Sequence, residues 1–385
     1  MNVVDIIIPV YRGLAETRAC IESVLAAQPQ QPLEIVVVDD ASPDAAISQL
    51  LADWSAAGKI TLLRNSANRG FVASVNRAMA LHADRDVVLL NSDTEVYADW
   101  LDRLVACAGA HPDAASLNPF SNNATLASYP RIGRPNALPE GFTGQQIDAL
   151  FARVNAGLVA DVPTTVGFCM FVRRSVLDEI GLFDESAFDR GYGEENDWCL
   201  RASAKGYRHL LCGDTFVFHH GEISFGADAK PGQQAAQAIV DARYPQYRDL
   251  ISRHFAQDPA RAMRQNIDLA RIALSPRPRL LFITHNWGGG TEKHVSDLAR
   301  LVAGQAEVLV LRPLSGGQLS MQWLRGQGDA AEPFRAFFEI PADEAALIDL
   351  LRSLGIARVH LHHVHQQPRM VLTLAARLGV PLDIT

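Results

Sequence analysis

Short apolar runs alternate with helical periodicity over the first 90 residues. Runs without polar interruption are typical of strands buried on both faces, whereas helices repeat apolar residues every three to four positions. The predicted strands are Asp5–Val10, Glu34–Val38, Lys59–Leu63 and Asp86–Leu90, and the predicted helices are Ala15–Ala27 and Gly70–Leu81. This alternation predicts an α/β fold whose sheet is mostly parallel and flanked by helices.

The pattern changes in the middle of the chain. Residues Asn118–Gln145 are rich in Pro, Gly, Ser and Asn, which predicts a long loop with a functional role, such as shaping the choice of acceptor. Periodicity returns with a strand at Phe168–Arg174, a helix at Glu194–Lys205 and a strand at Leu210–His219. Residues 233–274 are predicted to be helical.

A second α/β series follows the boundary signal Ser275–Pro278. Its predicted strands are Arg279–Thr284, Glu307–Leu311, Arg358–His362 and Pro381–Thr385, and its predicted helices end at Ala303 and span Asp343–Leu354. We therefore expect an α/β domain at 1–255, a helical linker at 256–277 and a partial α/β domain at 278–385.

Composition excludes several classes of protein. The chain has 35 Lys and Arg against 43 Asp and Glu, a net charge of −8, which disfavours nucleic acid as a partner. Its five cysteines form no CxxC pair, so neither a disulfide framework nor a zinc site is expected, and a reducing cytoplasm fits best. No apolar run is long enough to predict a transmembrane segment.

Polar side chains follow the first four predicted strands. Ligands of parallel α/β sheets bind at the carboxyl ends of the strands, so these side chains are candidates for a binding site. They are Pro9, Tyr11, Asp39, Asp40, Asn68, Gly70, Asn91, Ser92 and Asp93. Carboxylates here can accept hydrogen bonds from a base or hold a divalent cation, although Asp, Asn and Ser also cap helices and form turns.

The segment GYGEENDWCLRA predicts a helix with an acidic first turn. Helical spacing places Glu195 at the start of a small-residue face that points inward, and places Glu194 with Trp198 on a more polar face. Asp197 and Arg201 are spaced to form an ion pair. A carboxylate that leads an inward face needs a partner or a chemical role, although acids in a first turn also favour the helix dipole.

Five motifs in order resemble the family 2 glycosyltransferases, which have the Rossmann-like GT-A fold. The motifs are IIIPVYRG, VVVDDAS, NRGFVASVN, LLNSDTEV and GYGEENDWCLRA, and the resemblance, which is rhamnosyltransferase-like, covers residues 3–225. It implies an inverting transfer from a UDP- or dTDP-sugar, with rhamnose as one candidate, to a glycan or lipid-linked glycan acceptor. The implied process is synthesis of a bacterial surface polysaccharide of the O-antigen or capsule type, in the cytoplasm or at the inner face of its membrane.

The resemblance also implies residue roles. Pro9 and Tyr11 border the base, Asp40 accepts from its N–H edge, and Asp39 lies near the ribose or supports the site. Asn68, Gly70, Asn91 and Ser92 complete the nucleotide site, Asp93 and His219 hold Mg²⁺ or Mn²⁺, Glu195 is the general base, and Glu194, Asp197 and Trp198 bind the acceptor. Asn91 stands where many members carry the first acid of a DxD motif, so metal affinity is expected to be lower.

Two functions other than glycosyl transfer fit the sequence less well. A sugar nucleotidyltransferase needs a glycine-rich, basic loop after the first strand, whereas Tyr11–Glu16 is poor in glycine and contains an acid. A non-catalytic sugar-binding or scaffold module is disfavoured by the presence of Asp40, Asp93 and Glu195.

The later segment FITHNWGGGTEKHVSDLARLV resembles the first strand, glycine loop and helix of B-type (GT-B) glycosyltransferases of family 4. The implied domain is a partial Rossmann-like one, with Gly288–Gly290 before a helix. His360, His362, His363 and His365 cluster nearby. We expect them to mark a strand end near a cleft rather than a zinc site, because no carboxylate or thiolate completes the set.

Overall fold

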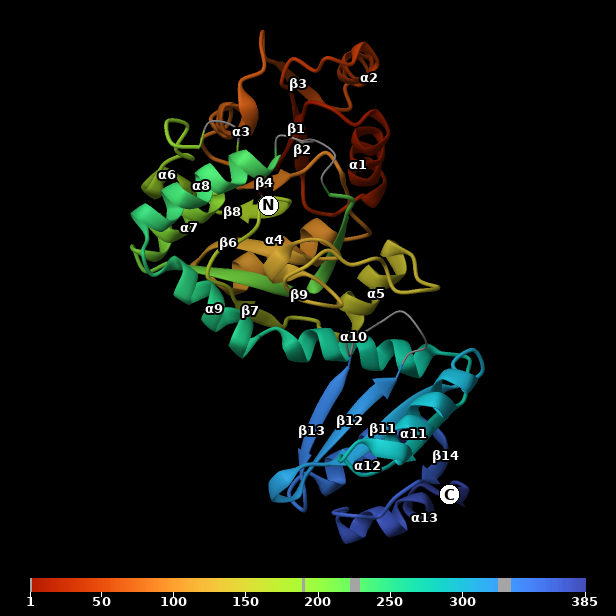
Figure 1. The fold of residues 1–385 in the computed structure, drawn as a ribbon. Helices are drawn as coiled ribbons and strands as arrows, with labels where there is room; N and C mark the ends of the chain where they lie inside the picture. Colours follow the sequence, from red (N-terminus) through yellow and green to blue (C-terminus); the bar gives the residue numbers. More distant parts are fainter. Residues whose placement is uncertain (1, 189–190, 222–228, 325–333) are drawn as a thin grey trace. The chain divides into compact units, whose positions relative to one another are not determined.

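The computed structural model describes residues 2–188, 191–221, 229–324 and 334–385 (Figure 1). The chain forms two compact units, Met1–Met263 and Arg264–Thr385. The division falls inside α10, Arg261–Leu274, between the two boundaries expected from the sequence.

The sheet of the first unit has the strand order β3-β2-β1-β4-β8-β6-β9-β5, with β7 paired to β9. Four neighbouring strands of this order, β3, β2, β1 and β4, are parallel, as predicted. Strand β8 pairs antiparallel with both β4 and β6. The bounds are β1 Val4–Val10, β2 Leu33–Asp39, β3 Thr61–Arg64, β4 Val87–Leu90, β5 Thr94–Glu95, β6 Ala114–Ser121, β7 Val159–Asp161, β8 Cys169–Val172 and β9 Arg208–His219. The predicted α/β class is confirmed, and the sheet as a whole is mixed.

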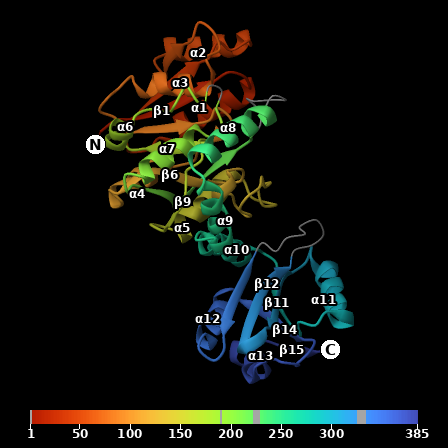
Figure 2. The same cartoon turned by 60° about the vertical axis from the view of Figure 1, so that its left-hand side comes forward.

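Helices cover both faces of this sheet (Figures 1 and 2). One hydrophobic cluster joins Ile7 and Val36 of the sheet to Val72 of α3, Trp198 of α7 and Val240 of α8. In Figure 1, α1 and α2 lie on the other side of β1 and β2. The bounds are α1 Leu14–Ala27, α2 Ala45–Ala56, α3 Gly70–Met79, α4 Trp100–Ala110, α5 Gly144–Val154, α6 Arg174–Ile180, α7 Glu194–Ser203, α8 Ala229–Arg243 and α9 Tyr247–Gln257.

The bounds predicted for the loop, Asn118–Gln145, are wrong at both ends. Strand β6 continues to Ser121, and α5 begins at Gly144 with a Thr143–Gln146 capping box. All eight residues of β6 are buried although several are small or polar, and their polar groups have partners: Asn118 Nδ2 donates to the Cys169 carbonyl at 2.6 Å. Apolar patterning could not identify a strand whose burial depends on paired polar groups.

The second unit contains a six-stranded sheet of order β13-β12-β11-β10-β14-β15. Strands β11, β10, β14 and β15 are parallel, and β12 and β13 extend the sheet in antiparallel fashion. The bounds are β10 Arg279–Ile283, α11 Gly289–Val302, β11 Glu307–Pro313, β12 Gln318–Leu324, β13 Arg335–Glu339, α12 Glu344–Ser353, β14 Ile356–Leu361, α13 Leu374–Leu378 and β15 Leu382–Ile384. The α/β pattern predicted for this region is present, and β12 and β13 were not predicted.

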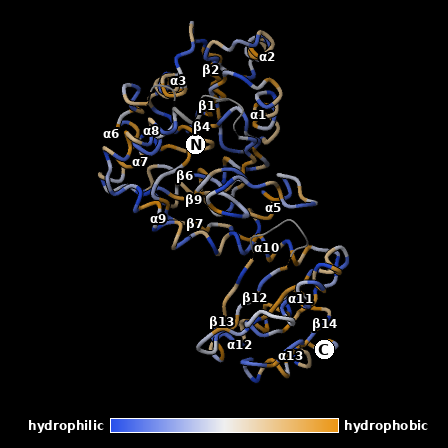
Figure 3. The backbone as a smooth tube through the Cα atoms, in the orientation of Figure 1, coloured by the Kyte–Doolittle hydropathy of each residue, from blue (hydrophilic) through white to orange (hydrophobic). Residues whose placement is uncertain are grey.

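Hydrophobic residues concentrate along the strands of each unit (Figure 3). Within the described parts of the chain, no helix combines the length and apolar character that crossing a membrane requires. The exposed helix positions are largely hydrophilic, in keeping with amphipathic helices that cover a sheet.

We expect Phe151→Ala to destabilise the first unit by about 3–5 kcal/mol, because it deletes a large side chain from a packed aromatic group. The Phe151 ring is fully buried and lies 4.8 Å from Phe120, 5.4 Å from Tyr129 and 5.6 Å from Phe216, between ring centroids. Equilibrium unfolding in urea measures the effect. Leu81→Ala, at a side chain that is 40% exposed, is the control and should change stability by less than about 0.5 kcal/mol.

Candidate functional site

Backbone hydrogen bonds continue past the carboxyl ends of β1, β2 and β3. The Asp40 amide donates to the Val10 carbonyl, and the Asn65 amide donates to the Asp39 carbonyl, both at 2.9 Å. These bonds hold the residues that follow the three strands next to one another. The candidate residues that come directly after β1 and β2 therefore meet at one edge of the sheet, as the sequence predicted.

Asp40 is buried and accepts three hydrogen bonds from the chain itself. Its Oδ1 accepts from Asn65 Nδ2 at 2.7 Å and from the Arg69 amide at 2.8 Å, and its Oδ2 accepts from the Gly70 amide at 2.9 Å. The Gly70 amide also lies 3.0 Å from Asn68 Oδ1. Because a carboxylate has about four acceptor positions, one remains on Oδ2 for an external donor.

Asp39 is also buried but is occupied by its own strand-end turn. It accepts from the Ser42 amide at 2.9 Å and from Ser48 Oγ at 3.0 Å. These contacts favour the supporting role over a contact with a ribose. Pro9 and Tyr11 are half-buried, and the Arg12 guanidinium lies 5.2 Å from the centre of the Tyr11 ring.

Asp93 and His219 come together at the carboxyl end of β4. Asp93 Oδ1 lies 3.4 Å from His219 Nε2, and Asp93 Oδ2 accepts from the Gly221 amide at 3.1 Å. Pairing of β5 with β9 places the two residues side by side, since Thr94 is opposite His219. Burial by itself would raise the pKa of Asp93, but the hydrogen bond and charge of His219 hold this pKa below its ordinary value.

The tautomer of His219 suits a metal ligand. His219 Nδ1 lies 2.6 Å from the Asn123 carbonyl oxygen, which can only accept, so Nδ1 carries a proton and Nε2 is the nitrogen that faces Asp93. In the free protein Nε2 interacts with the Asp93 carboxylate as a donor, and a bound metal would take the place of that proton. The two ligand atoms are close enough to bind one divalent cation, which would take its remaining ligands from outside this pair.

Three residues that hold His219 were not identified from the sequence. Asn122 contacts its backbone on both sides, accepting from the His219 amide at 2.8 Å and donating to its carbonyl at 3.0 Å. The Phe168 ring stacks on the imidazole with centroids 5.5 Å apart, and Asn123 orients Nδ1. The only sequence signal was an adjacent Asn pair inside the segment that was predicted as a loop.

Gly221 is required where it stands. Its φ of 77° is in the left-handed region, and a Cβ there would lie 2.0 Å from Asn123 Nδ2. Asn91 is half-buried and its backbone bonds to Phe168 and Thr94, while Ser92 is buried beside Asp93.

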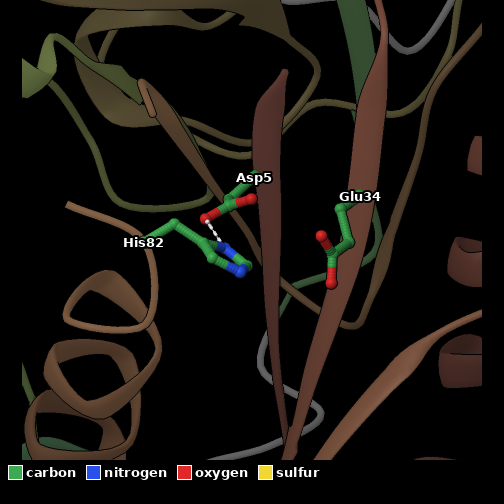
Figure 4. Close-up of side chains that lie close together, drawn as sticks. All are labelled: Asp5, Glu34 and His82. Carbon is green, nitrogen blue, oxygen red and sulfur yellow. Dashed lines mark hydrogen bonds and ion pairs between the residues drawn. The ribbon is translucent and has the colours of Figure 1, made fainter. Parts of the chain in front are cut away.

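A different group has the spacing of metal ligands at the opposite end of the strands. Asp5, Glu34 and His82 offer ligand atoms within 4.8 Å of one another, and Asp5 lies 2.8 Å from His82 Nδ1 (Figure 4). Arg85 Nη1, however, donates to Asp5 at 2.9 Å and to Glu34 at 2.6 Å. The guanidinium already supplies the positive charge, so we assign this cluster a structural role.

The start of α7 is held in an unusual backbone conformation. Gly191, Tyr192 and Gly193 all have positive φ, of 102°, 69° and 96°. A Cβ on Gly193 would lie 3.1 Å from both Phe188 and Val240. Tyr192 in the left-handed region costs about 1 kcal/mol or more, and strain of this kind concentrates at functional sites.

Glu194 and Glu195 form an interacting pair at this helix end. Glu194 is 4% exposed and its Oε2 has no hydrogen-bond partner among the described residues, whereas Glu195 accepts from the Gly193 amide at 3.1 Å. Burial and the charge of Glu195 raise the pKa of Glu194 well above its ordinary value, and burial also raises the pKa of Glu195. Of the two, Glu194 has the more strongly raised pKa, because it is buried beside the charge of Glu195.

Trp198 and Asp197 are directed into the protein. The Trp198 side chain is fully buried and its Nε1 donates to the Gly181 carbonyl at 2.9 Å. Since Glu194 is also buried, the prediction that these two residues lie on a polar face is wrong. Asp197 is also fully buried and accepts from Arg201 Nε at 2.9 Å, which confirms that ion pair, and from Arg243 Nη1 at 2.8 Å. We therefore leave both residues out of the proposed acceptor site.

The segment before β8 lies between the Asp93 region and α7. Phe168 stacks on His219, and Thr165 Oγ1 lies 3.3 Å from the Sγ of Cys199, one turn after Glu195. Ser116 of β6 adds a 2.7 Å contact to His209, whose Nε2 donates to the Cys199 carbonyl at 2.8 Å. These contacts connect the Asp93–His219 pair and the glutamates of α7 to the same part of the sheet.

We expect Asp197→Ala to lower the stability of the first unit by about 1.5–3 kcal/mol, because it removes charge-assisted hydrogen bonds to arginines that are partly exposed. Urea unfolding measures this, with the exposed Asp84→Ala as the control. Normal stability together with a raised KM for the acceptor would instead support the acceptor-binding role.

Residues 5–181 match the family model described as glycosyl transferase family 2. The matched span contains Pro9 to Asp93 and ends before α7 and β9. Relatives are similar at low identity. An N-acetylglucosaminyl-diphospho-decaprenol L-rhamnosyltransferase of Mycobacterium tuberculosis is 24% identical over 226 residues, which is 53% of this chain and 72% of that protein. A succinoglycan biosynthesis protein of Rhizobium meliloti is 27% identical over 238 residues, 60% of this chain and 67% of that protein.

Coverage differs between the proteins compared. The chain spans only 26% of the length of an uncharacterized protein of Sinorhizobium fredii, to which it is 26% identical over 245 residues, 60% of this chain. The crystal structure of GalNAc-T7 with UDP, GalNAc and Mn²⁺ superposes with a TM-score of 0.49 at 15% identity, over 69% of this chain and 54% of that one. The similarity to glycosyl transferase family 2 therefore lies in residues 5–181, within the first unit.

Proposed function

We propose that the first unit is an inverting, metal-assisted glycosyltransferase that moves a sugar from a nucleotide-diphosphate sugar to an acceptor hydroxyl. The observation that carries this proposal is the pairing of Asp93 with a His219 whose tautomer presents Nε2 to the carboxylate. This pair lies at the carboxyl end of a strand of a family 2 domain, which is where α/β sheets bind their ligands.

The nucleotide and diphosphate are bound by the strand ends. Asp40 has one acceptor position left for an N–H of the base, beside half-buried Pro9 and Tyr11. Asp93 and His219 would hold Mg²⁺ or Mn²⁺, which when bound neutralises the charge of the diphosphate leaving group. The low pKa of Asp93 keeps it ionised for that role at neutral pH.

Glu195 accepts the proton of the acceptor hydroxyl. It is the ionised member of the glutamate pair, and its raised pKa makes it a stronger base than an ordinary glutamate. Glu194 lies beside it, and its more strongly raised pKa makes it the member of the pair that takes up a proton first. A single displacement with one base inverts the anomeric centre.

The donor and acceptor are proposed from the relatives. A rhamnosyltransferase acting on a lipid-linked diphospho-sugar and a succinoglycan biosynthesis protein support a UDP- or dTDP-sugar, with rhamnose as one candidate, and a glycan or lipid-linked glycan acceptor. These relatives support a role in surface polysaccharide synthesis, which we propose takes place in the cytoplasm or at the inner face of the cytoplasmic membrane.

We expect Asp93→Ala and Glu195→Ala each to reduce sugar transfer by about 10²–10⁴-fold, since one removes a metal ligand and the other removes the general base. Nucleotide release from a panel of UDP-, dTDP- and GDP-sugars with Mg²⁺ or Mn²⁺ measures this. Asp84→Ala and Glu140→Gln, at exposed acids of the same unit, are the matched controls and should retain full activity. Full transfer by either site variant, or full transfer in excess chelator, would contradict the proposal.

The pH profile distinguishes the two glutamates. The general base acts when deprotonated, and the pKa of Glu195 is raised, so kcat/KM should fall on acidification at a higher pH than for an ordinary glutamate. Glu194→Gln should keep measurable activity and this loss of rate at acidic pH, because a neutral amide replaces a carboxyl group of raised pKa and similar shape. Glu195→Gln should abolish activity and, with it, the dependence of kcat/KM on acidification. The reverse result would make Glu194 the base.

A further inference from the structure

The side chain of Asn196 lies beside the carboxylate of Glu195. Asn196 Nδ2 donates to Glu195 Oε1 at 3.3 Å, while the Gly193 amide donates to Glu195 Oε2 at 3.1 Å. Each oxygen of this carboxylate therefore accepts a hydrogen bond at the start of α7. Hydrogen bonds of this kind favour the ionised form of a carboxyl group and fix its orientation.

A second contact determines which end of the Asn196 amide faces Glu195. Tyr247 Oη donates to Asn196 Oδ1 at 2.8 Å. The opposite orientation of the amide would place Oδ1 against the Glu195 carboxylate, where two acceptors would repel each other. With Oδ1 held by Tyr247, the donor Nδ2 is the end that faces Glu195.

Tyr247 is itself fixed by packing. It is the first residue of α9, is 8% exposed and belongs to the same hydrophobic cluster as Trp198 and Val240. Burial raises the pKa of Tyr247, although a hydrogen bond with Thr164 opposes this effect. The hydroxyl therefore keeps the proton that it donates to Asn196. Its position joins α9 to α7 and to the segment before β8.

The charges around Glu195 leave room for a neutral donor. The titratable groups that act on Glu195 or Tyr247 come from three helices and are Glu194 and Cys199 of α7, Asp241 of α8 and Tyr247 of α9. The arginines that contact α7 are occupied by Asp197, which pairs with Arg201 at 2.9 Å and with Arg243 at 2.8 Å. The amide of Asn196 can therefore orient Glu195 without a cation that would weaken it as a base.

We propose that Asn196 and Tyr247 are positioning residues for sugar transfer: Tyr247 Oη orients the Asn196 amide, and Asn196 Nδ2 holds the Glu195 carboxylate in the orientation in which it accepts a proton. The proposal rests on the role of general base that we propose for Glu195. Neither residue touches the reacting atoms in this scheme. Both act through Glu195, and without them burial would protonate this carboxyl group at a higher pH.

The test measures the titration of Glu195 directly, by NMR of the full chain labelled with ¹³C at the glutamate carboxyl groups. The signal is assigned by its loss in Glu195→Gln. Asn196→Leu has a similar shape but no donor, and it should move the midpoint of the Glu195 titration to higher pH, at about tenfold lower proton concentration, because a hydrogen bond to a charged group is lost. Tyr247→Phe should move the midpoint in the same direction by less, since the amide keeps its donor and loses only its orientation.

The double variant and a matched control separate positioning from packing. Because Tyr247 acts through Asn196, adding Tyr247→Phe to Asn196→Leu should cause no further change. Tyr244→Phe is the control: it removes a neighbouring hydroxyl that donates to Asp197 Oδ1 at 2.9 Å, and it should leave the Glu195 midpoint unchanged. An unchanged midpoint in Asn196→Leu would overturn the proposal, and so would an equal shift in Tyr244→Phe or full additivity in the double variant.

Activity separates this proposal from the function on which it rests. In the transfer assay with the UDP-, dTDP- and GDP-sugar panel, kcat/KM of Asn196→Leu and Tyr247→Phe should fall on acidification at a higher pH than in the wild type, in the order of the NMR midpoints. Midpoints that move while the pH dependence of kcat/KM stays in place would overturn both this proposal and the general-base role of Glu195. Midpoints that do not move would overturn this proposal alone.

Discussion

The buried parallel strands β1, β2 and β4 determine where the candidate residues at their own carboxyl ends lie. Their backbones are hydrogen-bonded on both sides of β1, and their side chains are buried on both faces, so they cannot shift without exposing apolar groups. The polar residues that follow them must therefore emerge at one edge. Bonds such as Asp40 to Val10 extend this register beyond the strands.

The buried carboxylates at and around this edge fall into two groups. Asp39, Asp40 and Asp197 accept several hydrogen bonds each from the chain, and these bonds compensate the loss of water. Asp93 and the pair Glu194–Glu195 instead face other titratable groups, and their pKa values shift accordingly. Titratable groups held against one another are typical of catalytic sites, because their charge is then available to a substrate or cation.

Histidine tautomers distinguish the two units. In the first unit, His219 donates through Nδ1 to the Asn123 carbonyl and directs Nε2 toward Asp93. In the second, His285 and His363 accept at Nδ1 from backbone amides and direct N–H groups outward. The backbone atom that lies beside Nδ1 thus decides whether this nitrogen donates or accepts in each unit.

The sequence by itself determined the α/β class, the parallel half of the first sheet and the strand-end positions of Asp40 and Asp93, because uninterrupted apolar runs and local turn chemistry depend only on neighbours along the chain. It also predicted the Asp197–Arg201 pair. It failed at β6, whose buried polar residues depend on distant partners, and at Trp198, whose burial depends on α7 packing against the sheet. Only the tertiary structure decided which carboxylates are satisfied and which histidine nitrogen carries the proton, because Asn123, Gly221 and Phe168 reach His219 and Asp93 from segments far apart in the chain.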